Sequence, residues 1–167
     1  MYKRQIIGCE HDQISGMYVF TKEDVVLTRE EAFQLLAEIG MEDELGNKKS
    51  FSGKELFSLL LPKGLNLEFK SKASSGCEFC AKGKKCPHDH YVVVENGKLK
   101  SGVIDKNAIG REAGKILDKI ESEYGSKEAQ KFINRVSLLG TKWLDKVGFT
   151  IGLDEVELEK EAKEKIR

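Results

Sequence analysis

Three cysteines and two histidines lie close together in residues 77–90, a segment with few other apolar side chains. They follow the pattern Cys77-x2-Cys80-x5-Cys86-Pro-His88-Asp-His90. Zinc prefers thiolate and imidazole ligands, and a Cys-x2-Cys turn presents two thiolates from one bend of the backbone. The pattern predicts a zinc site with Cys77, Cys80 and Cys86 as ligands. The fourth ligand is expected to be His88, because it follows Cys86 so closely, and His90 is the alternative.

A closed set of four protein ligands is typical of structural zinc, which stabilises a segment that has little core of its own. Residues 71–90 are therefore expected to form an insertion folded around structural Zn²⁺. Asp89, between the two histidines, could also assist in binding the metal. The remaining cysteine, Cys9, follows an apolar stretch and is expected to be a buried small hydrophobic residue.

Local signals divide the rest of the chain into helices and a hairpin. Capping boxes at Thr28–Glu31 and Ser52–Glu55 predict two helix starts, because the cap hydroxyl and the glutamate satisfy each other's backbone N–H groups. Residues 66–70 alternate polar and apolar like a strand, and Tyr91–Val94 is rich in β-branched residues. Asn96-Gly97 then predicts a tight hairpin turn, which requires positive φ at both positions.

From Asp105 onward, apolar residues recur at helical spacing, and Trp143 falls on the apolar face. The predicted fold class is α+β: helices around a small antiparallel β unit with a zinc-binding insertion. The chain has 167 residues, enough for one domain with a substantial core.

Charge and hydropathy exclude several classes of protein. The 28 basic residues equal the 28 acidic ones in number, which argues against an autonomous nucleic-acid binder or a membrane-surface module. The sequence has neither a membrane-spanning apolar run nor a signal-peptide pattern. We therefore expect a cytoplasmic protein whose cysteines are reduced.

Five ordered segments resemble the largest subunit of multisubunit DNA-directed RNA polymerase, most closely the archaeal A′ subunit. These segments include His-Asp-Gln-Ile-Ser-Gly (11–16), Leu-Thr-Arg-Glu-Glu-Ala-Phe (27–33), Phe-Ser-Gly-Lys-Glu-Leu-Phe-Ser-Leu-Leu-Leu-Pro (51–62), Ser-Gly-Val-Ile-Asp-Lys (101–106) and Gly-Phe-Thr-Ile-Gly (148–152). The resemblance implies that residues 1–152 are the pore domain, with the zinc-binding insertion at 71–90. Residues 153–167 would begin the first helix of the funnel domain.

The resemblance also implies a role within an assembly. The pore domain lines the secondary channel, through which nucleotides enter and backtracked RNA is extruded during transcription. Its partners would be the other polymerase subunits and the remaining domains of the largest subunit. Contact with DNA template, RNA and nucleotides would occur only within that assembly, and none with a membrane. The resemblance assigns no nucleic-acid-binding residues.

Nucleotidyl transfer in this family depends on an Asn-Ala-Asp-Phe-Asp-Gly-Asp run that holds Mg²⁺, and this sequence has no such run. Magnesium would therefore bind only in the intact polymerase. No catalytic residue is assigned, and the chain alone is expected to be inactive. We interpret it as an excised domain or the product of a split gene.

Two other functions remain open. A zinc-dependent hydrolase would need an open metal position and a general base such as Glu78 or Asp89. A zinc-stabilised adaptor would bind a partner protein through the apolar side of residues 153–167. The number of protein ligands on the metal, four or three plus water, separates the structural from the hydrolytic site.

Overall fold

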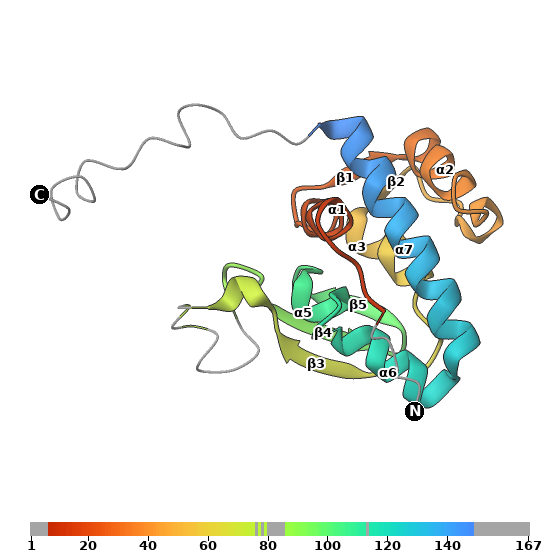
Figure 1. Cartoon of the computed structure of the whole chain (residues 1–167). Coiled ribbons are helices and arrows are strands. Elements are labelled where there is room, and N and C mark those ends of the chain that lie inside the picture. The colour runs from red at the N-terminus through yellow and green to blue at the C-terminus, as the bar shows by residue number, and fades with distance from the viewer. Residues whose placement is uncertain (1–6, 76, 78, 80–85, 113, 149–167) are drawn as a thin grey trace, which may run out of the picture.

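A computed structural model describes residues 7–75, 77, 79, 86–112 and 114–148. The predicted funnel helix at 153–167 and the predicted ligand Cys80 lie outside these residues. The fold is α+β, as predicted. The described helices are α1 (Asp12–Phe20), α2 (Arg29–Ala37), α3 (Gly53–Leu59), α5 (Lys106–Ile109), α6 (Lys115–Tyr124) and α7 (Ser126–Val147), with 3-10 turns η1 (Glu42–Glu44) and η2 (Lys72–Ser74). The strands are β1 (Val26–Thr28), β2 (Ser50–Ser52), β3 (Leu67–Lys70), β4 (Tyr91–Glu95) and β5 (Lys98–Ser101) (Figure 1).

Both predicted capping boxes are present. The Thr28 hydroxyl accepts the Glu31 backbone N–H at the start of α2, and the Ser52 hydroxyl accepts the Glu55 N–H at the start of α3. Thr28 and Ser52 also end β1 and β2, which pair antiparallel with Leu27 opposite Phe51. This two-stranded sheet was not predicted. It holds the starts of the two helices side by side.

The predicted hairpin forms the larger sheet, with strand order β3-β4-β5 and antiparallel pairing throughout. Asn96 and Gly97 join β4 to β5 with φ of 50° and 71°, as the turn prediction requires. Phe69 in β3 lies opposite Val92 in β4, and both side chains are buried. The sheet therefore contributes one face to the core.

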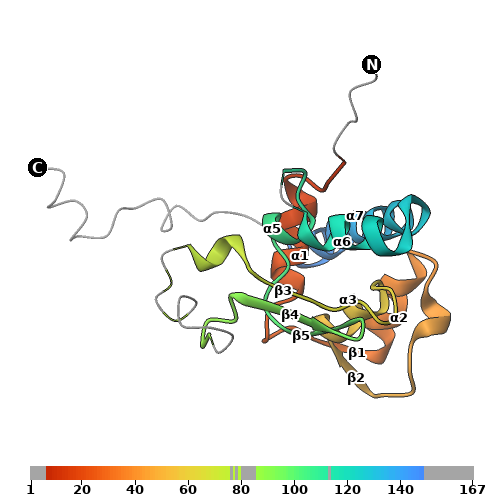
Figure 2. The same ribbon diagram turned by 90° about the horizontal axis from the view of Figure 1, so that it is seen from below.

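The core lies between the sheets and a helical layer. Figure 2 shows α1, α6 and α7 on one side of the molecule, with α3 and the sheets on the other. The Phe57 ring of α3 meets the Phe132 ring of α7 edge-to-face across the two sides, at 6.2 Å between ring centroids, and Phe20 of α1 meets Trp143 of α7 in the same way within the helical side, at 5.2 Å. No helix in the described part of the chain combines the length and apolar character needed to cross a membrane.

Cys9 is buried, as predicted, with 1% of its surface exposed. Its backbone N–H donates to the Ile109 carbonyl at 2.8 Å, and its Sγ lies 3.5 Å from the Ser137 hydroxyl oxygen. Burial raises the pKa of the Cys9 thiol. A protonated, enclosed thiol is a packing residue and a poor nucleophile.

Candidate metal centre

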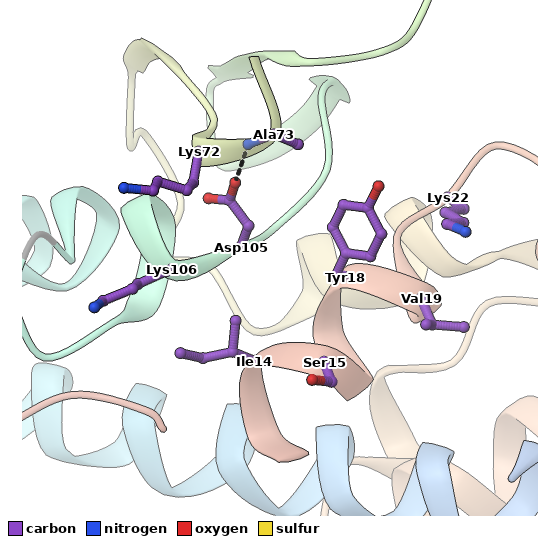
Figure 3. A pocket seen from close by; sticks show the side chains of 9 residues that line it. All are labelled: Ile14, Ser15, Tyr18, Val19, Lys22, Lys72, Ala73, Asp105 and Lys106. Atoms are coloured by element: carbon purple, nitrogen blue, oxygen red, sulfur yellow. Dashed lines mark hydrogen bonds between the residues drawn. The ribbon is translucent and has the colours of Figure 1, made fainter. Parts of the chain in front are cut away.

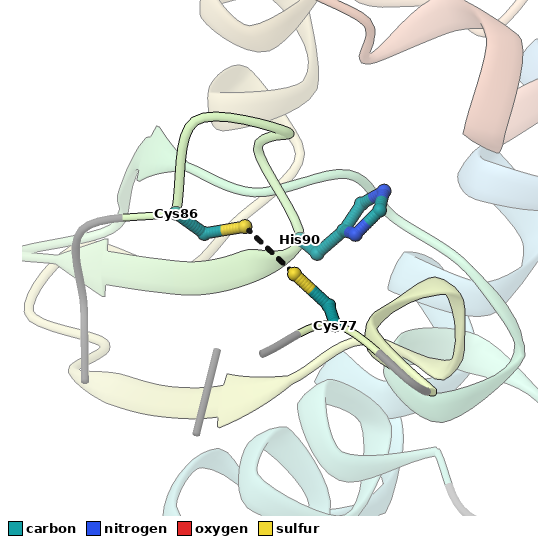
Figure 4. A group of neighbouring side chains, drawn as sticks. All are labelled: Cys77, Cys86 and His90. Atoms are coloured by element: carbon teal, nitrogen blue, oxygen red, sulfur yellow. Dashed lines mark hydrogen bonds between the residues drawn. The ribbon is translucent and has the colours of Figure 1, made fainter. Parts of the chain in front are cut away.

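Cys77, Cys86 and His90 converge at the end of the larger sheet, and we call them the thiol–imidazole group (Figure 4). One potential ligand atom from each residue lies within 4.8 Å of those from the other two. Cys77 follows η2, whereas Cys86 begins the turn at residues 86–90, which leads into β4. In the described ranges, no other group of three cysteine, histidine or acidic residues comes as close together.

The separation of the two sulfurs suits a shared metal ion. Cys77 Sγ and Cys86 Sγ lie 3.7 Å apart. Two sulfurs bound about 2.3 Å from one tetrahedral zinc would lie about 3.8 Å apart. A disulfide would require a separation of about 2.05 Å. The observed distance therefore matches coordination geometry and not a disulfide bond.

The His90 side chain carries an unsatisfied nitrogen. Its Nδ1 atom is buried and has no hydrogen-bond partner among the described residues. Buried polar side-chain atoms normally have a partner, so an exception needs an explanation such as an ion. A metal bond would supply that partner. The sulfur and nitrogen donors and their spacing thus fit zinc.

The backbone around His90 explains its direction. The His90 carbonyl accepts the Ser71 N–H at 3.0 Å, which continues the β3–β4 pairing one step beyond Lys70 and Tyr91. Successive residues of an extended chain point to opposite sides. His90 is thus oriented by the sheet itself, whereas His88 is not.

His88 lies beside the group rather than within it. Its ring is exposed, and its centroid lies 5.7 Å from that of His90. It also meets the exposed Phe79 ring edge-to-face at 5.9 Å. The structure therefore brings together Cys77 and Cys86, two of the predicted ligands, with the alternative histidine, His90.

The Asp89 carboxylate contacts other parts of the protein. One carboxylate oxygen pairs with Lys54 Nζ, and the other accepts the Gly102 backbone N–H at 2.6 Å. The sequence contained no local signal for these contacts, because Lys54 and Gly102 are distant in the chain. Both oxygens are engaged, so Asp89 is poorly suited to act as a metal ligand or as the base of a hydrolase.

A separate pocket of about 360 Å³ lies between α1 and the segments around η2 and α5 (Figure 3). Its lining is mostly apolar, and Lys22, Lys72 and Lys106 contribute to it. Asp105 could provide acid–base chemistry there, but its carboxylate accepts backbone N–H groups of Ala73 at 3.1 Å and Asn107 at 2.9 Å. Asp105 therefore serves to hold η2 against α5.

Comparison with known proteins gives one family and a consistent set of relatives. Residues 2–156 match the family described as RNA polymerase Rpb1, domain 3. The chain is 40% identical over 161 residues to DNA-directed RNA polymerase subunit Rpo1N of Methanothermobacter thermautotrophicus, covering 96% of this chain and 18% of that protein. It is 39% identical over 173 residues to the Methanococcus vannielii subunit, covering 99% and 19%.

The subunit of the same name from Methanocaldococcus jannaschii is 40% identical over 168 residues, which cover 96% of this chain and 12% of that protein. The chain thus spans less than a fifth of the length of each of these relatives.

Proposed function

Because the chain belongs to the family of RNA polymerase Rpb1, domain 3, we propose that it is the pore domain of the largest subunit of an archaeal DNA-directed RNA polymerase. In this proposal it lines the secondary channel, where nucleotides enter and backtracked RNA leaves. The observation that carries the proposal is the match of residues 2–156 to this family. Residues 153–167 would begin the funnel domain.

The proposed role is architectural. Nucleotidyl transfer needs carboxylates that bridge Mg²⁺ and phosphate. The sequence has no aspartate-rich run of that kind. The remainder of the polymerase would supply the Mg²⁺ site and the contacts to DNA template, RNA and the other subunits.

Photocrosslinking tests the channel role. A polymerase reconstituted with this sequence in its largest subunit would be stalled with RNA carrying 4-thiouridine at its 3′ end. We expect crosslinks to peptides from residues 7–148 in backtracked complexes, and far fewer in complexes with the 3′ end at the active site. Equal crosslinking in the two states would overturn the assignment.

We further propose that the insertion at 71–90 binds one structural Zn²⁺ through Cys77, Cys80, Cys86 and His90. The 3.7 Å separation of the Cys77 and Cys86 sulfurs and the unsatisfied Nδ1 of His90 support this set. Cys80 is included from the Cys-x2-Cys pattern. The bound metal would neutralise the thiolates and close a segment that contributes nothing to the hydrophobic core among its described residues.

Metal analysis of two matched variants tests the ligand set. Native mass spectrometry of the whole chain should find one zinc per molecule. His90→Ala should lose zinc, whereas His88→Ala should retain it, because His88 stands outside the thiol–imidazole group. Loss of zinc from His88→Ala alone would restore His88 as the fourth ligand.

The alternative functions make different predictions. A hydrolase would hold zinc through three protein ligands and a water of pKa near 7. The engagement of Asp89 by Lys54 and Gly102 disfavours it as the base, and Glu78 lies outside the described residues. The adaptor hypothesis depends on residues 153–167, which also lie outside the described residues. X-ray absorption spectroscopy that found a bound oxygen in place of a fourth protein ligand would favour the hydrolase.

A further inference from the structure

Asp89 occupies a strained position between the two histidines. Its φ is 55°, a left-handed conformation that residues other than glycine seldom adopt, although aspartate and asparagine tolerate it best. Its backbone N–H donates to the Cys86 carbonyl at 3.1 Å, which closes the turn at residues 86–90. Such strain persists where surrounding contacts impose it.

Those contacts come from two other parts of the fold. The Asp89 carboxylate pairs with Lys54 in the first turn of α3 and accepts the N–H of Gly102, just after β5. The Asp89 and Lys54 side chains are only 12% and 13% exposed. A second carboxylate, Glu23, approaches Lys54 Nζ to 3.8 Å but is largely exposed. The main electrostatic partner of Lys54 is therefore Asp89.

The turn is then held from both sides. On the sheet side, the His90 carbonyl accepts the Ser71 N–H, and the Tyr91 carbonyl accepts the Ser101 hydroxyl at 3.0 Å. On the other side, the Asp89 carboxylate connects the turn to Lys54 and Gly102. The carboxylate thus helps to place the backbone between Cys86 and His90, and both of these residues belong to the thiol–imidazole group.

We infer that Asp89 and Lys54 are positioning residues for the metal site, which hold Cys86 and His90 in the arrangement that zinc requires. This inference rests on the zinc site of the proposed function. Groups that orient metal ligands without touching the metal commonly alter affinity by about 10- to 100-fold when mutated. Conversely, zinc bound to Cys86 and His90 would stabilise the pairing of Asp89 with Lys54, and so the first turn of α3.

Zinc affinity, measured by competition with a chromophoric chelator on the whole chain, tests the inference. Asp89→Asn keeps a side chain that tolerates positive φ and removes the charge. Lys54→Met removes the partner charge from outside the turn, so the loop sequence stays intact. We expect each to weaken zinc binding about 10-fold, and the double variant to be no weaker than the single ones, because they break the same pair.

A matched control and an apo measurement separate positioning from general stability. Lys48→Met breaks the ion pair with Glu55, a pair that also involves α3 but is well exposed, and should change zinc affinity less than about 2-fold. If Asp89 and Lys54 only stabilise the fold, their variants will melt earlier by the same amount with and without zinc, at unchanged affinity. That result would overturn the inference and leave the zinc site standing. A wild-type chain that binds no zinc would overturn both.

Discussion

Gly16 in α1 and Gly140 in α7 lie back to back where the two helices cross. A β-carbon on Gly16 would lie 2.1 Å from the Gly140 carbonyl oxygen, and one on Gly140 would lie 2.7 Å from the Gln13 carbonyl oxygen. The obstructing atoms are backbone, so they cannot move aside by a change of rotamer. Glycine at these two positions sets the distance between the helices.

Gly16→Ala should therefore push α1 away from α7. We expect a loss of about 1–3 kcal/mol in the free energy of unfolding, the range for overpacked interiors. Chemical denaturation measures it. Gly46→Ala is the control, because a β-carbon there meets nothing within 4 Å. Equal stability of the two variants would show that the helices can separate without penalty.

The buried Thr21 side chain connects two segments of the fold through hydrogen bonds. Its hydroxyl donates to the Met17 carbonyl at 2.8 Å and accepts the Ile104 N–H at 2.9 Å, which connects the end of α1 to the segment after β5. Thr21→Val keeps the shape but leaves the Ile104 N–H without a partner. We expect a loss of about 1–3 kcal/mol in the free energy of unfolding.

Thr141→Val is the matched control for Thr21. Within the described part of the chain, the contact of the Thr141 hydroxyl is a hydrogen bond that it donates to the Ser137 carbonyl of its own helix turn, at 3.0 Å. Removing it leaves no buried donor without a partner, so thermal unfolding should barely change. A Thr21→Val variant as stable as Thr141→Val would mean that Ile104 finds another acceptor.

Glu31 should make stability depend on pH. The Lys146 ammonium, followed by the Thr28 backbone and hydroxyl donors, lowers the pKa of the Glu31 carboxyl from its ordinary 4.5 to about 2. The folded protein thus binds this proton less tightly than the unfolded chain. The stabilisation is present above pH 4.5 and is lost as pH falls toward 2.

Glu31→Gln removes that titration. The wild type should be the more stable protein at pH 7, and its advantage should shrink steadily between about pH 5 and pH 2 in denaturation experiments. Glu30→Gln, at the adjacent exposed position, serves as the control. A gap between wild type and Glu31→Gln that stays constant over this range would contradict the assigned contacts.

Zinc removal should loosen the insertion and spare the core. Among the described residues, none between Phe69 and Val92 belongs to the hydrophobic core. After chelation, amide hydrogen exchange should accelerate in residues 71–90 while α7 stays protected. Substituting Cys77 should have the same local effect. Cooperative loss of protection in α7 on chelation would contradict a local role for the metal.

The features that could be predicted from the sequence depend on interactions between residues close together in the chain. A capping box needs only residues three apart, so Thr28 with Glu31 and Ser52 with Glu55 were recognisable, and both formed. The Asn96-Gly97 turn also formed, because its backbone preference is intrinsic to those two residues. The grouping of Cys77 with Cys86 could be expected because both lie in one short segment.

Other features depend on residues far apart in the chain. The three-residue strands β1 and β2 carry too few residues for a periodic pattern, and the residues that pair, such as Leu27 and Phe51, are far apart in the sequence. The choice between His88 and His90 has a similar origin. The spacing favoured His88, whereas in the folded chain the hydrogen bond from Ser71 to the His90 carbonyl and the contacts of Asp89 place His90 beside the sulfurs.

By itself, the sequence determined the family, the helix starts, the hairpin and the set of metal-ligand candidates, since each rests on neighbouring residues or ordered motifs. Only the tertiary structure decided that Gly16 meets Gly140, that Lys54 meets Asp89, and that His90 completes the thiol–imidazole group. The physical reason is common to all three. Close packing, charge pairing in a desolvated site and ligand geometry depend on distances that exist only once the chain has folded.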